Sequence, residues 1–251
     1  MSGHSKWATI KRKKGAADAK RSNEFAKLLR AVEVAAREGG SGDPKANMTL
    51  GSAIDKARAS SVPADTIERA IKRGTGELGG GARYEEVAYE GYAPGGVAVF
   101  VECLTDNRNR TAQEVRHAFT RNGGNLGESG SVAWMFQRKG LIQIEKAEAP
   151  DEERLLEIAL EAGADDLADG ESTWEIITEP ATFAAVRDAI AGGSVAMLSA
   201  ELTMVPQSAV PVERGQAKQV LALLEALEEL DDVQNVYANF DIPESVMAEL
   251  G

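Results

Sequence analysis

The residues in this sequence best suited to binding chemistry are cations grouped near its start. Residues 1–30 hold nine lysines and arginines against two acids, a local charge of +7. Cations at this density can neutralise phosphates, and a nearby tryptophan or histidine can stack on a nucleobase. We therefore expect a nucleic-acid-binding arm over residues 1–20, with contacts that continue into the helix after it. The expected contacts are His4, Lys6, Trp7, Lys11, Arg12, Lys13, Lys14, Lys20, Arg21, Lys27 and Arg30.

The end of the chain has the opposite charge. Residues 143–251 hold five basic residues against 24 acids, and the whole chain carries −12. A basic arm on an acidic body is typical of a protein that binds a polyanion at one end and repels it elsewhere. The alternative is a solvated tail that aids solubility, which explains a basic cluster in an acidic chain poorly. If about six phosphates are neutralised, the logarithm of the binding constant should fall with log[salt] at a slope of roughly −4 to −5.

Composition limits the compartment. Cys103 is the only cysteine among 251 residues, so no intramolecular disulfide can form, as suits a reducing compartment. No apolar run approaches the roughly 20 residues of a membrane span. No apolar stretch follows the N-terminal cations, so the N-terminus lacks the pattern of a secretory signal. We expect a cytoplasmic protein with no membrane partner.

No pattern of residues indicates catalysis. His4 and His117 are the only histidines, and no cysteine and histidine cluster has zinc-ligand spacing. The glycine-rich residues 123–130 lack the Lys-Ser/Thr of a P-loop, and the acids from Asp165 onward fail the calcium-loop spacing. We expect these acids to form a solvated loop. We expect no enzyme activity, cofactor, metal or small-molecule substrate.

Residues 21–74 have the periodicity of three short helices. In the first, Phe25, Leu28, Leu29 and Val32 recur at helical spacing; the second is expected to begin at Asp43, and the third near Pro63. Packed as a bundle, these helices would leave further cations outside as candidate nucleic-acid contacts. The candidates on the third helix are Arg69, Lys72 and Arg73. Residues 75–82 are predicted to be a glycine-rich linker that acts as a hinge.

After the linker, strands and helices alternate. We expect strands at 84–92, 97–105, 131–137, 141–145, 173–178, 197–205 and 233–240, and helices at 110–121, 151–162, 181–191 and 213–230. The fold class is therefore α+β multidomain: an N-terminal three-helix domain followed by two small α+β domains, one inserted in the other. The expected domains are 1–20 (arm), 21–74 (helical bundle), 75–82 (linker), 83–137 plus 207–251, and the insertion 138–206.

The loop 105–111 is a second candidate site. It lies between a central strand and a helix N-terminus, a place that favours anions. We expect Asn107, Arg108 and Arg110 to make a secondary anion or partner contact. The alternative is simple capping of the helix by Asn109 or Asp106, and the two roles are compatible.

Several motifs together resemble the YebC/PmpR family. They are Gly3-His4-Ser5-Lys6-Trp7, Ile10-Lys11 with Lys14, residues 89–96 (YEGYAPGG), residues 105–111 (TDNRNRT), residues 122–124 (NGG) and residues 130–136 (GSVAWMF). The resemblance runs over nearly the whole chain. It implies three domains, one α+β domain being inserted in the other, and it brings no established catalytic residue or cofactor. Family members are labelled DNA-binding transcriptional regulators, and others are tied to the ribosome and to easing stalled elongation.

Two nucleic-acid targets therefore stay open. A DNA regulator usually presents a recognition helix, for which the third helix is the candidate. An extended basic arm on an acidic body suits insertion among RNA strands at least as well. We expect a nucleic-acid-binding regulator of gene expression: a DNA-binding transcriptional regulator by the family label, or alternatively a ribosome-associated translation factor that binds ribosomal RNA.

Overall fold

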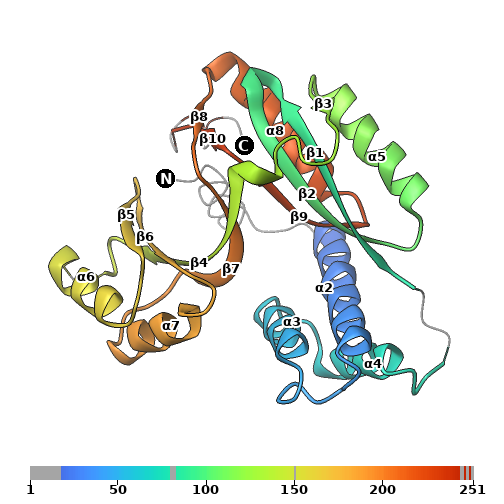
Figure 1. The fold of residues 1–251 in the computed structure, drawn as a ribbon, viewed down its shortest axis with the longest axis horizontal. Coiled ribbons are helices and arrows are strands. Elements are labelled where there is room, and N and C mark those ends of the chain that lie inside the picture. The colour runs from blue at the N-terminus through green and yellow to red at the C-terminus, as the bar shows by residue number, and fades with distance from the viewer. Residues whose placement is uncertain (1–17, 80–82, 150, 244–245, 247–248, 250–251) are drawn as a thin grey trace.

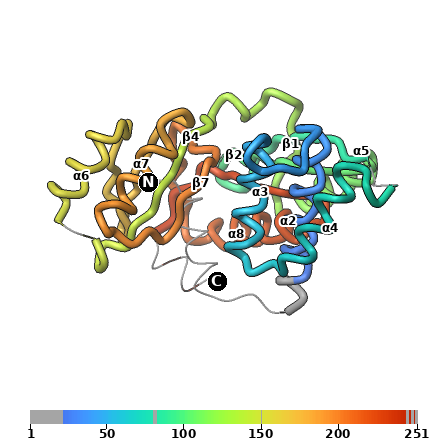
Figure 2. The backbone as a smooth tube through the Cα atoms, turned by 90° about the horizontal axis from the view of Figure 1, so that it is seen from below, coloured from blue at the N-terminus to red at the C-terminus, as the bar shows by residue number. Residues whose placement is uncertain are grey.

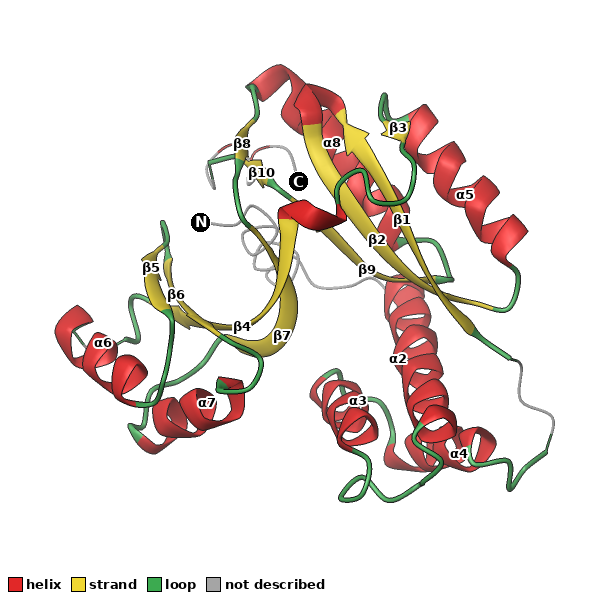
Figure 3. Ribbon diagram, viewed as in Figure 1, coloured by secondary structure: helices red, strands yellow, loops and turns green. Residues whose placement is uncertain are grey.

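The chain forms an N-terminal three-helix domain and two α+β domains, one inserted in the other, as the sequence predicts (Figure 1). This computed structural model describes residues 18–79, 83–149, 151–243, 246 and 249, with side chains from Ser22 onward. Figure 3 separates the helices from the strands. We call the two α+β domains together the body. The exact domain boundaries given above stay predictions.

The N-terminal domain is built from α2 (Asp18–Glu38), α3 (Met48–Ala59) and α4 (Ala64–Gly74). Its apolar positions form one buried cluster, which includes Val32, Leu50 and Ile67. The helical periodicity of the sequence is thus confirmed as a bundle.

The second helix begins later than the sequence indicated. Asn47 is its N-cap, because the Asn47 side chain accepts a hydrogen bond from the Leu50 N–H at 3.0 Å. Asp43 instead begins the preceding turn, where its carbonyl accepts from the N–H groups of Ala46 and Asn47. Asparagine and aspartate are about equally good N-cap residues. The local sequence therefore does not decide between a helix that begins after Asp43 and one that begins after Asn47.

The first sheet has the strand order β3-β1-β2-β9 and is antiparallel throughout. Its central strand β2 is apolar on both faces, as its alternation predicts. Val97, Val99 and Val101 pack against α5 and α8, while Ala98 and Phe100 join a smaller cluster on the opposite face. The bounds are β1 (Glu85–Ala93), β2 (Val97–Thr105), α5 (Arg108–Arg121), β3 (Asn125–Leu126), α8 (Arg214–Glu228) and β9 (Val233–Ala238).

The second sheet has the order β5-β6-β4-β7, and the two helices α6 and α7 cover one face (Figure 1). Two expectations were wrong here. The acidic stretch from Asp165 contains strand β5, and residues 133–135 form a 3-10 helix (η2) rather than a strand. The bounds are η2 (Ala133–Met135), β4 (Phe136–Glu145), α6 (Glu152–Glu161), β5 (Asp166–Asp169), β6 (Thr173–Thr178), α7 (Phe183–Gly192) and β7 (Ser199–Pro206).

The chain returns from the inserted domain to the first one through a short parallel pair, β8 (Val210–Pro211) with β10 (Phe240–Asp241). Figure 2 shows the consequence: the inserted domain with α6 and α7 lies at one end of the molecule, and the helical domain lies toward the other. The strands β4 and β7 run from the inserted domain toward the centre.

Candidate nucleic-acid interface

Most of the predicted arm lies outside the described residues. This holds for His4, Lys6, Trp7, Lys11, Arg12, Lys13 and Lys14. Lys20 and Arg21 are placed by their backbone in the first turns of α2. The role of these residues in nucleic-acid binding therefore stays a prediction.

The last two cations of the predicted set, Lys27 and Arg30, lie where α2 meets the body. The Lys27 ammonium donates to the carbonyl of Glu228, and the Asn23 amide donates to the carbonyl of Glu229 at 2.9 Å. Both carbonyls belong to the C-terminal end of α8, where carbonyl groups lack intrahelical partners and a cation is favoured by the helix dipole. We call this contact, with the Arg30 bonds described next, the α2–body joint.

Arg30 completes the joint. Its guanidinium donates to the carbonyls of Leu104 (3.1 Å) and Asp231 (2.9 Å) and to the carboxylate of Asp232 (3.1 Å). It also lies over the ring of Tyr84, 5.0 Å from the ring centroid. Tyr84 is among the first residues described after the predicted linker, so Arg30 contacts the start of the body directly.

Asp232 is the buried centre of this region, with 2% of its surface exposed. One carboxylate oxygen accepts from Arg30, and the other accepts from Thr105 (3.0 Å), Arg110 (2.7 Å) and Thr111 (2.7 Å). Burial alone would raise the pKa of Asp232, but hydrogen bonds from Arg110, Thr111 and Thr105 lower it overall. The carboxylate is therefore held ionised and fixes three segments at once.

The loop 105–111 caps its helix and binds Asp232. Asn107 is the N-cap of α5, since its side chain accepts from the Arg110 N–H at 3.1 Å; the expected caps Asn109 and Asp106 were wrong. Arg110 pairs with Asp106 and Asp232, hydrogen bonds that raise the pKa of Arg110. Arg108 lies 3.7 Å from Glu85. A contact of Asn107, Arg108 and Arg110 with an outside anion stays a prediction.

A cleft of about 480 Å³ lies beside the joint. Its lining carries two cations, Arg30 and Arg110, and five acids, Asp106, Glu114, Glu229, Asp231 and Asp232. Because the acids are at least as numerous as the cations, the cleft offers no net positive charge to a phosphate.

The basic residues of α4 are also paired within the chain. Arg69 contacts Asp65 at 2.9 Å, and Lys72 contacts Glu68 at 2.7 Å. Arg73 donates to the buried carboxylate of Glu33 at 3.0 Å. The first two pairs are exposed and exchange easily with water, whereas the third holds α4 to α2. Their proposed role toward nucleic acid is untested.

Sequence reasoning missed two exposed cations on α5. Arg116 and Arg121 have no ion-pair partner in the part of the chain that the structure describes, unlike the arginines of α4. The signal was available: no acid stands three or four residues from either position along the helix. Trp134, which lies in the segment expected to be a strand at 131–137, is also exposed.

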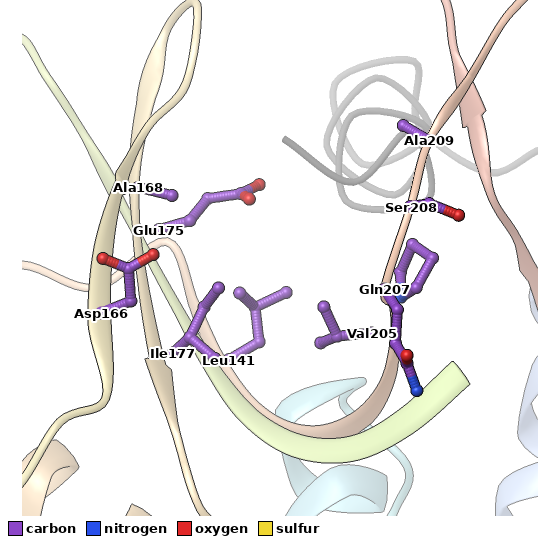
Figure 4. A pocket seen from close by; sticks show the side chains of 10 residues that line it. Leu141, Asp166, Ala168, Glu175, Ile177, Val205, Gln207, Ser208 and Ala209 are labelled. Atoms are coloured by element: carbon purple, nitrogen blue, oxygen red, sulfur yellow. The ribbon is translucent and has the colours of Figure 1, made fainter. Parts of the chain in front are cut away.

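A second cavity, of about 240 Å³, opens on the inserted domain. Leu141, Ile177 and Val205 form an apolar side, and Asp166 and Glu175 project beside them (Figure 4). Two carboxylates and no cation in the lining make this cavity unsuited to phosphate.

Among the residues described, no group of three or more acids, histidines or cysteines could hold a metal ion. Burial raises the pKa of the Cys103 thiol to about 12.

The described helices include none that is long and apolar enough to cross a membrane.

Comparison with known proteins gives the family. Residues 5–77 match the TACO1/YebC protein N-terminal domain, and residues 84–240 match the TACO1/YebC second and third domain.

Full-length relatives agree with this match. A protein of Geobacter sulfurreducens named "Probable transcriptional regulatory protein" is 56% identical over 250 residues, covering 100% of both chains. One of Syntrophus aciditrophicus with the same kind of name is 53% identical, covering 100% of this chain and 99% of the relative. The crystal structure of a conserved hypothetical protein from Aquifex aeolicus superposes with a TM-score of 0.77 at 49% identity, covering 90% of this chain and 92% of that one. This chain therefore belongs to the TACO1/YebC family, the YebC/PmpR family that its motifs indicate.

Proposed function

We propose that this protein is a cytoplasmic, non-enzymatic regulator of gene expression that binds nucleic acid through its basic N-terminal arm. The observation that carries the proposal is the charge contrast between a +7 start and a −19 end of one chain. Such a contrast attracts a phosphate backbone to one end of the molecule and keeps it off the other.

The cations of α2 and α4 that the sequence also predicts as contacts support this assignment to the arm. Lys27 and Arg30 bond to the body, and the three basic residues of α4 have acidic partners. Residues 1–17, by contrast, contain five cations and no acid. The names of the relatives favour transcription, so duplex DNA is the first target to test.

A ribosome-associated role is the second candidate, and one observation favours it. In the helical domain, every basic residue of α4 is paired with an acid, so this helix does not present a free row of base-reading side chains. Major-groove readout depends on such a row. RNA is often recognised by backbone and shape instead, which an extended basic arm can do.

The experiment measures binding to duplex DNA and to purified ribosomes over a salt series. The test variant replaces the five arm cations Lys6, Lys11, Arg12, Lys13 and Lys14 with glutamine. The matched control replaces five cations outside the arm that ion pairs already engage, Arg58 in the helical domain and Lys146, Arg154, Arg187 and Arg214 in the body, so its net charge changes equally. We expect the arm variant to flatten the salt slope by about 4, since each duplex phosphate that is no longer neutralised changes the slope by roughly 0.9, and the control to stay within about 1.

The two targets give different results. Saturable, sequence-dependent DNA binding without retention on ribosomes supports transcriptional regulation. Retention on ribosomes above physiological salt that disappears in the arm variant supports the translation role. Equal binding by the arm variant and the control would show that the arm does not bind the nucleic acid.

A further inference from the structure

Trp134 presents an aromatic ring to solvent from a short 3-10 helix. Its side chain is 66% exposed, which leaves a large apolar area in water at a cost of hydrophobic free energy. The other large apolar side chains that are exposed in the described part of the chain are Met48, Leu78, Leu156 and Leu160. None of them belongs to the segment around Trp134, so the ring stands by itself.

A buried carboxylate holds this segment in place. Glu90 in β1 is 5% exposed and accepts from three backbone N–H groups: Gly130 (2.6 Å), Val132 (2.7 Å) and Ala133 (2.7 Å). Burial alone would raise the pKa of Glu90, but these three hydrogen bonds lower it overall. A charged acceptor with three backbone donors fixes the backbone that leads into the turn that carries Trp134.

Further bonds orient the ring itself. The Trp134 indole N–H donates to the Ser131 carbonyl at 3.2 Å, and the Tyr92 hydroxyl donates to the same carbonyl at 3.1 Å. On the other side, Gln207 donates to the carbonyls of Trp134 (3.2 Å) and Met135 (2.9 Å). The indole hydrogen bond and the anchored backbone thus restrict the ring before any ligand arrives, and a preorganised group loses little entropy on binding.

The surroundings of the ring distinguish between possible ligands. A protein partner normally buries a continuous apolar patch with an aromatic anchor near its centre. The exposed residues near Trp134 in the chain are polar instead, namely Glu128, Ser129 and Gln137, and so is Gln207, which bonds to the Trp134 carbonyl. A single flat ring beside amides, a hydroxyl and one carboxylate is suited to stacking on a base, whose edges can then bond to those polar groups.

We propose that Trp134 is a stacking platform for an unpaired RNA base. This inference rests on the proposed nucleic-acid function and adds a contact on the body, away from the arm. RNA is the favoured source because its loops and bulges offer unstacked bases, whereas the bases of duplex DNA are stacked inside the helix. Arg138, exposed four residues after Trp134 and without an ion-pair partner among the described residues, is available for the adjoining phosphate.

The test compares two RNAs of equal length, one with an unpaired loop and one a blunt duplex. Trp134→Ala removes the ring, and Trp134→Phe keeps an aromatic face. Leu160→Ala, which trims a 50% exposed apolar side chain on α6, is the matched control. We expect Trp134→Ala to weaken binding of the looped RNA by about 5- to 150-fold, the equivalent of removing one base stack, with the blunt duplex within about twofold.

Fluorescence gives an independent readout. In a variant with Trp7→Phe and Trp174→Phe, Trp134 is the only tryptophan left. Looped RNA should quench its emission and protect it from acrylamide, and the blunt duplex should do neither. Trp134→Phe should retain most of the affinity that Trp134→Ala loses.

The results separate this inference from the function on which it rests. If the unaltered protein binds neither RNA nor DNA, the proposed function fails. If it binds looped RNA but Trp134→Ala binds as tightly, the stacking platform is wrong. A loss confined to single-stranded DNA of the same sequence would overturn the assignment to RNA.

Discussion

Asp232 is the residue on which the contact between the helical domain and the body depends. Its buried carboxylate accepts hydrogen bonds from α2, from the end of β2 and from α5. Hydrogen bonds to a buried charge are worth more than neutral ones, and losing the charge leaves several donors poorly matched.

Asp232→Asn should therefore lower the free energy of unfolding by about 2 kcal/mol at pH 7. The pKa of Asp232 in the folded protein is below its unfolded value of about 3.9, so ionised Asp232 stabilises the fold above that pH. This contribution is lost as the pH falls below about 4, through the folded pKa. The difference between variant and unaltered protein should thus shrink toward pH 3, as measured by urea unfolding at each pH.

The control for this prediction is Asp231→Asn. Asp231 is exposed, and its contact with Arg30 is made by the backbone carbonyl, which the substitution keeps. It should change stability by less than about 0.5 kcal/mol at either pH. A constant difference for Asp232→Asn across the pH range would show that its charge is not what stabilises the joint.

At this scale the sequence predicts local chemistry better than long-range partners. The sequence predicts a helix start rich in donors at the loop 105–111, and the structure confirms a capped helix there. Its principal acceptor, Asp232, comes from more than 120 residues away in the chain. The residues next to Asp232 in the sequence do not indicate which distant residues it contacts in the fold. The role of Asp232 could therefore not be predicted.

Among the elements, the packing of α4 on α2 depends on a glycine. A Cβ at Gly74 would lie 2.3 Å from the carbonyl oxygen of Glu33 and 2.8 Å from the Cβ of Ala36. Gly74 is the last residue of α4, and Thr75 is its C-cap. Its lack of a side chain lets the two helices approach closely.

Gly74→Ala should destabilise the helical domain by about 1–3 kcal/mol, because backbone atoms must move apart to admit the methyl group. Thermal unfolding followed by circular dichroism measures this. Gly51→Ala, within α3, is a suitable control, since the nearest atom to its Cβ would be 3.2 Å away. A Gly74→Ala variant as stable as the control would mean that the helices can separate without loss.

Elements were predictable where one periodicity dominated. The alternation in β2 and the helical spacing in α2 and α8 place these elements within a few residues of their observed bounds. The segment at 131–137 resembles a strand because Val132, Trp134 and Phe136 are apolar and two residues apart, as on one face of a strand. In the structure Val132 and Phe136 are buried, whereas Trp134 is exposed. The sequence does not predict strand β5, because Asp166 and Asp169 give this segment the acidic composition of a surface loop. Both residues are exposed because β5 is an edge strand of its sheet.

For the whole molecule, the main question is how firmly the helical domain is held to the body. The two have separate hydrophobic clusters, which share no residue. Polar contacts join them instead: the α2–body joint, and a pair between Lys56 of α3 and Glu201 of β7 at 3.6 Å. These few polar contacts would limit how far the helical domain can rotate about the hinge predicted at residues 75–82. Because the contacts involve charged groups, salt and pH can weaken them.

Lys27→Met with Arg30→Met should release the helical domain without unfolding it, because each part keeps its own core. The aliphatic stems stay similar in length, while the bonds to the carbonyls of Glu228 and Leu104 and to the Asp232 carboxylate are removed. Small-angle scattering at physiological salt should show a larger radius of gyration, and the unaltered protein should approach that value as salt is raised. Arg58→Met with Arg69→Met removes two charges from ion pairs inside the helical domain and should leave the radius unchanged. If the joint variant stays as compact as this control, the linker itself, and not the α2–body joint, sets the domain orientation.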